Sequence, residues 1–200
     1  MSKTNWREVW RRFSGKGVYP QELAFLLDSP LRKLILPAGR LVDRFRLSRD
    51  SRVLEIGPGP GYFSPEVARR IPEGELILFD IQREMLAKSR AKLVRTGHMN
   101  FHLVQGSADA LPFAANTFDV VFLVTVLGEV RNPQVCMANI VEVLRPGGVL
   151  SLTEQTGDPD ALTEAELQRM GETEGLCCMA VSKFRGGFTL NLTKRSIKTS

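Results

Sequence analysis

Two features of the sequence have the residue types and the spacing that a ligand site needs. The first is a glycine-rich stretch at residues 57–61 (Gly-Pro-Gly-Pro-Gly), which directly follows an apolar segment ending at Ile56. Alternate glycines permit a tight turn and let the backbone come within contact distance of a ligand. The second is Asp80, which ends another apolar segment and is spaced like the acid that accepts hydrogen bonds from ribose hydroxyls in nucleoside-binding folds. Together they predict a nucleoside-type ligand.

The spacing of the glycines separates the possible ligands. A dinucleotide-binding fingerprint requires a third glycine three positions after the second, and Tyr62 stands at that position. A diphosphate is therefore disfavoured, and a nicotinamide-dependent oxidoreductase is the less favoured alternative. A tight strand-to-helix turn that binds no ligand also fits the glycines taken alone.

Alternating apolar strands and helices must position these residues. Ser64 as N-cap and Pro65 at the first helical position predict a helix start after the glycine loop. Asn132 caps a later helix, and Thr163 with Glu166 forms a capping box that opens the last one. Strands are expected at residues 53–56, 76–80, 101–105, 120–124 and 149–152, followed by a hairpin of residues 176–183 and 188–193. This order is typical of an α/β protein with a parallel sheet.

Several of these stretches resemble motifs of the class I S-adenosylmethionine-dependent methyltransferases. Residues 53–61 (Val-Leu-Glu-Ile-Gly-Pro-Gly-Pro-Gly) are similar to motif I of that family, whose loop packs against the methionine and ribose parts of the cofactor. Residues 118–129 resemble its strand-four signature, and residues 144–148 (Leu-Arg-Pro-Gly-Gly) resemble its turn before strand five. The resemblance extends over residues 53–152, with the motifs in the family's order.

The resemblance implies a doubly wound, seven-stranded, mostly parallel sheet with an antiparallel last strand, and S-adenosylmethionine as cofactor. The adenine-binding loop departs from the family's pattern, because Ser107 replaces the usual aspartate. Ser107, Asp109 or the backbone of Ala108 is left to meet the adenine amino group. The cofactor contacts implied for this sequence are Glu55, Gly57, Pro58, Gly59, Gly61, Asp80, Ile81, Met85, Ser107, Ala108, Asp109, Val124 and Thr125.

The implied reaction is attack of a substrate nucleophile on the sulfonium methyl group. Glu129 and Glu154 follow or end strands four and five, so they are candidate bases; they are equally candidates to attract a cationic amine or to be solvated loop carboxylates. Trp6, Trp10 and Tyr19 are candidates to shape the substrate pocket. We expect a helical N-terminal arm or lid at residues 1–47 and the cofactor-binding domain at residues 48–200.

The substrate class is bounded by what the sequence lacks and resembles. After strand four there is no Asp/Asn-Pro-Pro-Tyr stretch and no Pro-Cys nucleophile, so a nucleic-acid base is disfavoured. The resemblance is closest to the group that methylates quinone precursors, lipids, sterols and other small metabolites. The aromatic residues and arginines of the arm suggest an apolar or anionic small molecule.

Composition sets further bounds. The chain has 200 residues, is 43% hydrophobic and carries a formal net charge of +5, with the basic excess before residue 53. The basic ends are compatible with a membrane surface or RNA, so a catalytically silent cofactor-binding module is the main alternative function. The three cysteines are odd in number and two are adjacent, which favours reduced thiols. We expect a cytoplasmic protein with no structural metal.

Overall fold

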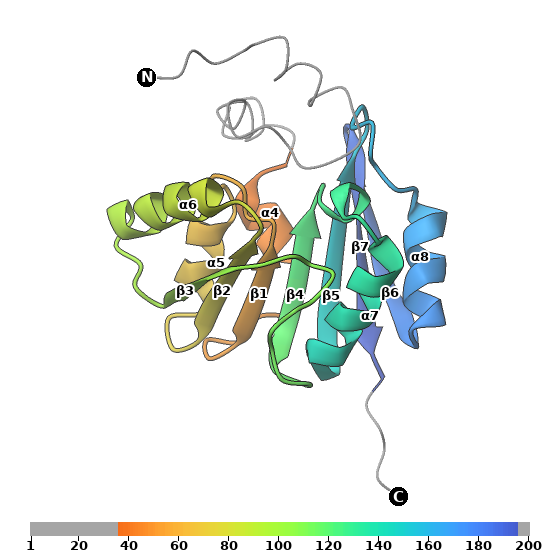
Figure 1. Cartoon of the computed structure of the whole chain (residues 1–200), viewed down its shortest axis with the longest axis horizontal. Helices are drawn as coiled ribbons and strands as arrows, with labels where there is room; N and C mark the ends of the chain where they lie inside the picture. The colour runs from red at the N-terminus through yellow and green to blue at the C-terminus, as the bar shows by residue number, and fades with distance from the viewer. Residues whose placement is uncertain (1–35, 196–200) are drawn as a thin grey trace, which may run out of the picture.

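The computed structural model describes residues 36–195 and arranges seven strands in one sheet of order β3-β2-β1-β4-β5-β7-β6 (Figure 1). Strand β7 is antiparallel to both of its neighbours, and the pairs from β3 through β5 are parallel. This confirms the predicted fold class. The strands are β1 (Arg52–Ile56), β2 (Glu75–Asp80), β3 (Phe101–Gln105), β4 (Phe118–Val124), β5 (Leu144–Gln155), β6 (Leu176–Phe184) and β7 (Gly187–Lys194).

Helices cover both faces of this sheet. The central strand β4 shows why, because Val120 and Phe122 pack in one hydrophobic cluster whereas Val121 and Leu123 pack in the other. A strand that is buried on both faces reads as an uninterrupted apolar run. The first cluster includes residues of α4 (Ala38–Val42), α5 (Ser64–Arg70) and α6 (Arg83–Arg95), and the second includes residues of α7 (Pro133–Val143) and α8 (Glu164–Thr173). No helix within residues 36–195 combines the length and apolarity needed to cross a bilayer.

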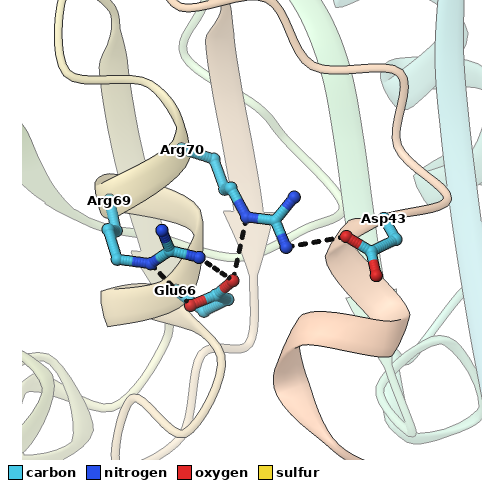
Figure 2. A network of polar contacts seen from close by, with 4 residues as sticks. All are labelled: Asp43, Glu66, Arg69 and Arg70. Atoms are coloured by element: carbon cyan, nitrogen blue, oxygen red, sulfur yellow. Dashed lines mark hydrogen bonds and ion pairs between the residues drawn. The ribbon is translucent and has the colours of Figure 1, made fainter.

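Helix α4 lies within the segment expected to form a helical arm, and it is held against the domain by apolar packing and by an ion pair to α5. Leu41 and Val42 are buried in the same cluster as α5. Figure 2 shows Arg70 of α5 between two carboxylates: its Nη2 lies 2.7 Å from Asp43 Oδ1, and its Nε lies 2.9 Å from Glu66 Oε1. The neighbouring Arg69 also binds Glu66 and, with Arg70, lowers the pKa of that carboxyl. The described end of the predicted arm is therefore packed against the domain.

Helices begin at all three predicted places, and two of the three predicted caps are confirmed. The Asn132 side chain accepts a hydrogen bond from Val135 N, and Thr163 and Glu166 form the full capping box. Ser64 was expected to be an N-cap, and that prediction is wrong. Helix α5 already includes Ser64, whose hydroxyl donates at 2.6 Å to a carboxylate on β1.

Strand β5 also begins earlier than expected. Its assigned span starts at Leu144, so residues 144–148 belong to the strand instead of forming a separate turn before it. The pairing with β4 shifts register between Phe118 and Val120, which accommodates the glycines at residues 147 and 148.

Candidate functional site

A cavity of about 1210 Å³ lies at the edge of the sheet where the parallel strands end. The segments that follow β1, β2, β3, β4 and β5 all contribute to its lining. Ligands of open α/β sheets bind at this edge, outside the carboxyl ends of the strands. The volume exceeds the roughly 300–1,000 Å³ typical of a site for one small ligand. The cavity has room for two.

The glycine loop after β1 forms one wall of the cavity. Gly57, Gly59 and Gly61 all have positive φ angles, of 66°, 54° and 74°. A Cβ atom on Gly57 would lie 2.5 Å from Cγ2 of Val126, so the loop is held against the segment after β4. Gly61 does not line the cavity; a Cβ there would lie 2.9 Å from the Cα of Ser89 on α6. Gly61 therefore serves helix packing, while the first two glycines present backbone to the cavity.

Two buried acids border this loop. Glu55 on β1 is only 2% exposed and accepts the hydroxyl hydrogen bond that displaced the expected helix cap. Asp80 at the end of β2 accepts a hydrogen bond from Gln82 N at 2.8 Å, and the backbone N–H groups of Gly59 and Ile81 also donate to it. Burial nevertheless raises the pKa of Asp80 to about 6, because removal from water outweighs these hydrogen bonds. Its carboxylate is fixed in position at the cavity wall.

The loop after β3 leaves one acceptor atom unused. The Ser107 hydroxyl lies 3.3 Å from Asp109 Oδ2, and Asn139 Nδ2 donates to the carbonyl of Ala108 at 3.4 Å. Asp109 Oδ1 is buried and has no hydrogen-bond partner among residues 36–195. Of the candidates for meeting an amino group, Asp109 thus has free accepting capacity, which a buried polar atom normally does not keep.

The structure brings together nearly all of the residues singled out in the sequence for the cofactor. Gly61 is the exception described above. Trp6, Trp10 and Tyr19 lie outside the described residues. Lining the cavity are Glu55, Gly57, Pro58, Gly59, Asp80, Ile81, Met85, Ser107, Ala108, Asp109, Val124 and Thr125.

The two candidate bases occupy different environments. Glu129, at the end of the 3₁₀ helix η2 (Leu127–Glu129), lines the cavity. Glu154 on β5 does not line it and is 4% exposed. Burial, followed by the charges of Asp158 and Glu129, raises the pKa of Glu154 to about 8. Sequence reasoning missed Asp158 and Asp160, which also line the cavity; the Asp-Pro-Asp run after β5 was their only signal.

Comparison with known proteins agrees with this geometry. A protein family described as a methyltransferase domain matches residues 53–148. The ubiquinone/menaquinone biosynthesis C-methyltransferase UbiE of Pasteurella multocida is 36% identical over 115 residues, which cover 56% of this chain and 43% of that protein. The UbiE of Erwinia tasmaniensis is 34% identical over 141 residues, covering 66% and 56%. The chain spans about half the length of these curated relatives.

A solved structure shares the whole fold. The S-adenosylmethionine-dependent methyltransferase from Aquifex aeolicus superposes with a TM-score of 0.82 at 20% identity, covering 88% of this chain and 98% of that one. The family match, the curated relatives and the shared fold support a class I S-adenosylmethionine-dependent methyltransferase. The cofactor of this family is S-adenosylmethionine, and the glycine loop, Asp80 and the open acceptor of Asp109 suit it.

Proposed function

We propose that this protein transfers a methyl group from S-adenosylmethionine to a small-molecule acceptor. The observation that carries the proposal is one cavity that combines the glycine loop and the acid after β2 with space for a second ligand. The cofactor supplies a methyl group already activated on a sulfonium. The protein's part is then to position the acceptor and to exclude water.

The proposed cofactor contacts follow from the polar groups at the wall. A carboxylate offers about four acceptor sites, so Asp80 retains capacity for ribose hydroxyls beside its three backbone donors. We assign the adenine amino group to Asp109, whose Oδ1 lacks a partner in the described chain. Ile81 is an apolar side chain that is 50% exposed at the cavity, and a bound adenine ring would cover it together with Met85.

The test is calorimetric titration with S-adenosylmethionine and S-adenosylhomocysteine. We expect micromolar binding by the wild type and its loss in Asp80→Ala and Gly59→Val. Glu172→Ala changes an exposed acid on α8 and serves as the control that keeps binding. Full binding by the Asp80 variant would remove the proposed ribose contact, and no binding by the wild type would refute the function.

Two further measurements, of methyl transfer and of NADH fluorescence, separate the alternatives. Cofactor binding without methyl transfer to any acceptor would favour the silent binding module, and enhanced NADH fluorescence would favour an oxidoreductase. The proposal keeps the cytoplasmic location expected from the sequence and does not involve nucleic acid. The relatives' names point to a quinone-like acceptor; the charges of the cavity favour a different class.

A further inference from the structure

The part of the cavity beyond the cofactor residues is rich in acids. It is formed by the segment after β4 and by residues 155–166. Glu166 is occupied by the capping box of α8, and Arg131 is exposed. The other carboxylates that line this part are Glu129, Asp158 and Asp160, and the solvated guanidinium beside them is that of Arg131. Together with the buried carboxyl of β5 we call them the acidic cluster, which consists of Glu129, Glu154, Asp158 and Asp160.

Backbone contacts hold the two acidic segments against each other. A Cβ atom on Gly128 would collide with the carbonyl oxygen of Asp160, so the two chains touch at this point. Asp158 Oδ1 accepts the backbone N–H of Asp160 at 3.0 Å, which fixes the turn that carries both acids. The charges of Asp158 and Glu129 also act directly on Glu154. The acidic cluster is thus formed where two loops pack against each other.

Two acceptors in the cluster are buried without a partner. Glu154 is 96% removed from solvent, and no donor or cation of the described chain binds its carboxyl. Asp160 Oδ1 is likewise buried and unpartnered within residues 36–195. Buried carboxylates are normally hydrogen-bonded or paired with a cation, and here the nearest charges are themselves negative. Within residues 36–195, no positively charged donor therefore serves these two carboxyls.

The positive ligand is better matched by an organic cation than by a metal ion. Among the described residues, no group of three or more His, Cys, Asp or Glu side chains has the arrangement that a metal requires. A protonated amine brings up to three donors and tolerates more widely spaced carboxylates. The expected anionic acceptor rested on the arginines of the arm, residues 1–47, and those that the structure describes, Arg40, Arg44 and Arg46, do not line the cavity.

We propose that the methyl acceptor is a primary or secondary amine whose ammonium group binds in the acidic cluster. This inference rests on the proposed function, because it names the acceptor of the same site. In the reaction, the ammonium first passes one proton to a carboxylate of the cluster. The freed nitrogen lone pair then forms the bond to the methyl carbon, the carbon–sulfur bond breaks with its electron pair going to sulfur, and S-adenosylhomocysteine and the methylated ammonium result.

The experiment measures binding to protein saturated with S-adenosylhomocysteine, where no turnover occurs. The probes are matched pairs of amine and alcohol: benzylamine with benzyl alcohol, and 2-phenylethylamine with 2-phenylethanol. A charge-assisted contact predicts about tenfold or greater preference for the amine in at least one pair. We expect Asp158→Asn to reduce that preference severalfold, and Glu154→Gln to reduce it severalfold at pH 9, where the carboxyl of Glu154 is ionised. Glu142→Gln, which removes an exposed carboxylate on α7, is the matched control and should keep it.

The outcomes separate the two proposals. If S-adenosylhomocysteine does not bind the wild type, the methyltransferase function itself fails. If it binds and every amine binds no better than its alcohol, or not at all, only the amine inference is overturned. If Glu154→Gln weakens S-adenosylhomocysteine itself, the cluster serves the cofactor, and the inference is overturned as well.

Discussion

Replacing Glu154 by glutamine should stabilise the protein at high pH. The carboxyl of Glu154 is buried, and burial, followed by the charges of Asp158 and Glu129, raises its pKa from 4.5 to about 8. A folded state that holds a proton more tightly than the unfolded state loses stability as pH rises from the unfolded pKa to the folded one. The wild type should therefore lose stability between about pH 4.5 and pH 8 through this one group.

The magnitude follows from the size of the shift. At 1.36 kcal/mol for each pKa unit, a rise from 4.5 to about 8 corresponds to an upper limit of about 5 kcal/mol. Water that enters around an ionised Glu154 reduces this cost, so we expect about 3 kcal/mol. Glutamine has nearly the same shape as the protonated acid and cannot ionise. At pH 5 the variant should differ little from the wild type, and at pH 9 it should be about 3 kcal/mol more stable.

The assay is urea denaturation of both proteins from pH 5 to pH 9. Glu142→Gln removes an equal charge from the surface of α7, and its difference from the wild type should stay within about 0.5 kcal/mol throughout. The quantity that decides is the change in the Glu154→Gln difference between the two ends of the pH range. A change below about 1 kcal/mol would refute the claim that a buried, unpaired carboxyl sits at this position.

Three further predictions concern the cofactor site and the sheet edge. Because burial raises the pKa of Asp80 to about 6, S-adenosylhomocysteine affinity should fall up to about tenfold for each pH unit below 6, and calorimetry on Asp80→Asn should show a flat profile. Gly57→Ala combines a positive φ of 66° with a Cβ 2.5 Å from Val126, so urea denaturation should show a loss of about 2 kcal/mol; Val126→Ala added to it should restore only the steric part. Lys194 Nζ donates to two carbonyls near the end of α7 and to Asn116. Lys194→Met should therefore lower the free energy of unfolding by about 2 kcal/mol and leave S-adenosylhomocysteine affinity unchanged. An equal loss of affinity would show that this edge of the sheet affects the cofactor site.

Local signals predicted the parts of the fold that depend on neighbours in sequence. The cap at Asn132 and the box at Thr163 each involve residues three positions apart, and both were read correctly. Ser64 was misread because its partner, Glu55, lies on another element and its burial is visible only in the folded chain. A short-range sequence pattern can predict that a serine caps a helix. It cannot predict that a buried carboxylate elsewhere in the fold will accept the serine hydroxyl instead.

The residues of the site also differ in whether the sequence could predict them. The glycines and Asp80 were found because their spacing along one strand-loop-helix unit carries the signal. The acids of residues 158–160 were missed, because only the folded chain shows that this loop contacts Gly128 in the segment after β4. Glu154 was named as a candidate, but its burial is visible only in the folded chain. Functional residues on a single unit are readable from sequence, and those defined by contact between loops are not.

The position of β7 has a consequence for how the domain is made. In the strand order, β7 lies between β5 and β6, and β6 pairs with no other strand of the sheet. A nascent chain leaves the ribosome in sequence order, so β6 and the helix before it emerge ahead of β7, the strand with which β6 pairs. The sheet can close only when residues 187–194 have cleared the exit tunnel and inserted between strands already made. Until then, the open edge of β5 is the surface that a chaperone would need to shield.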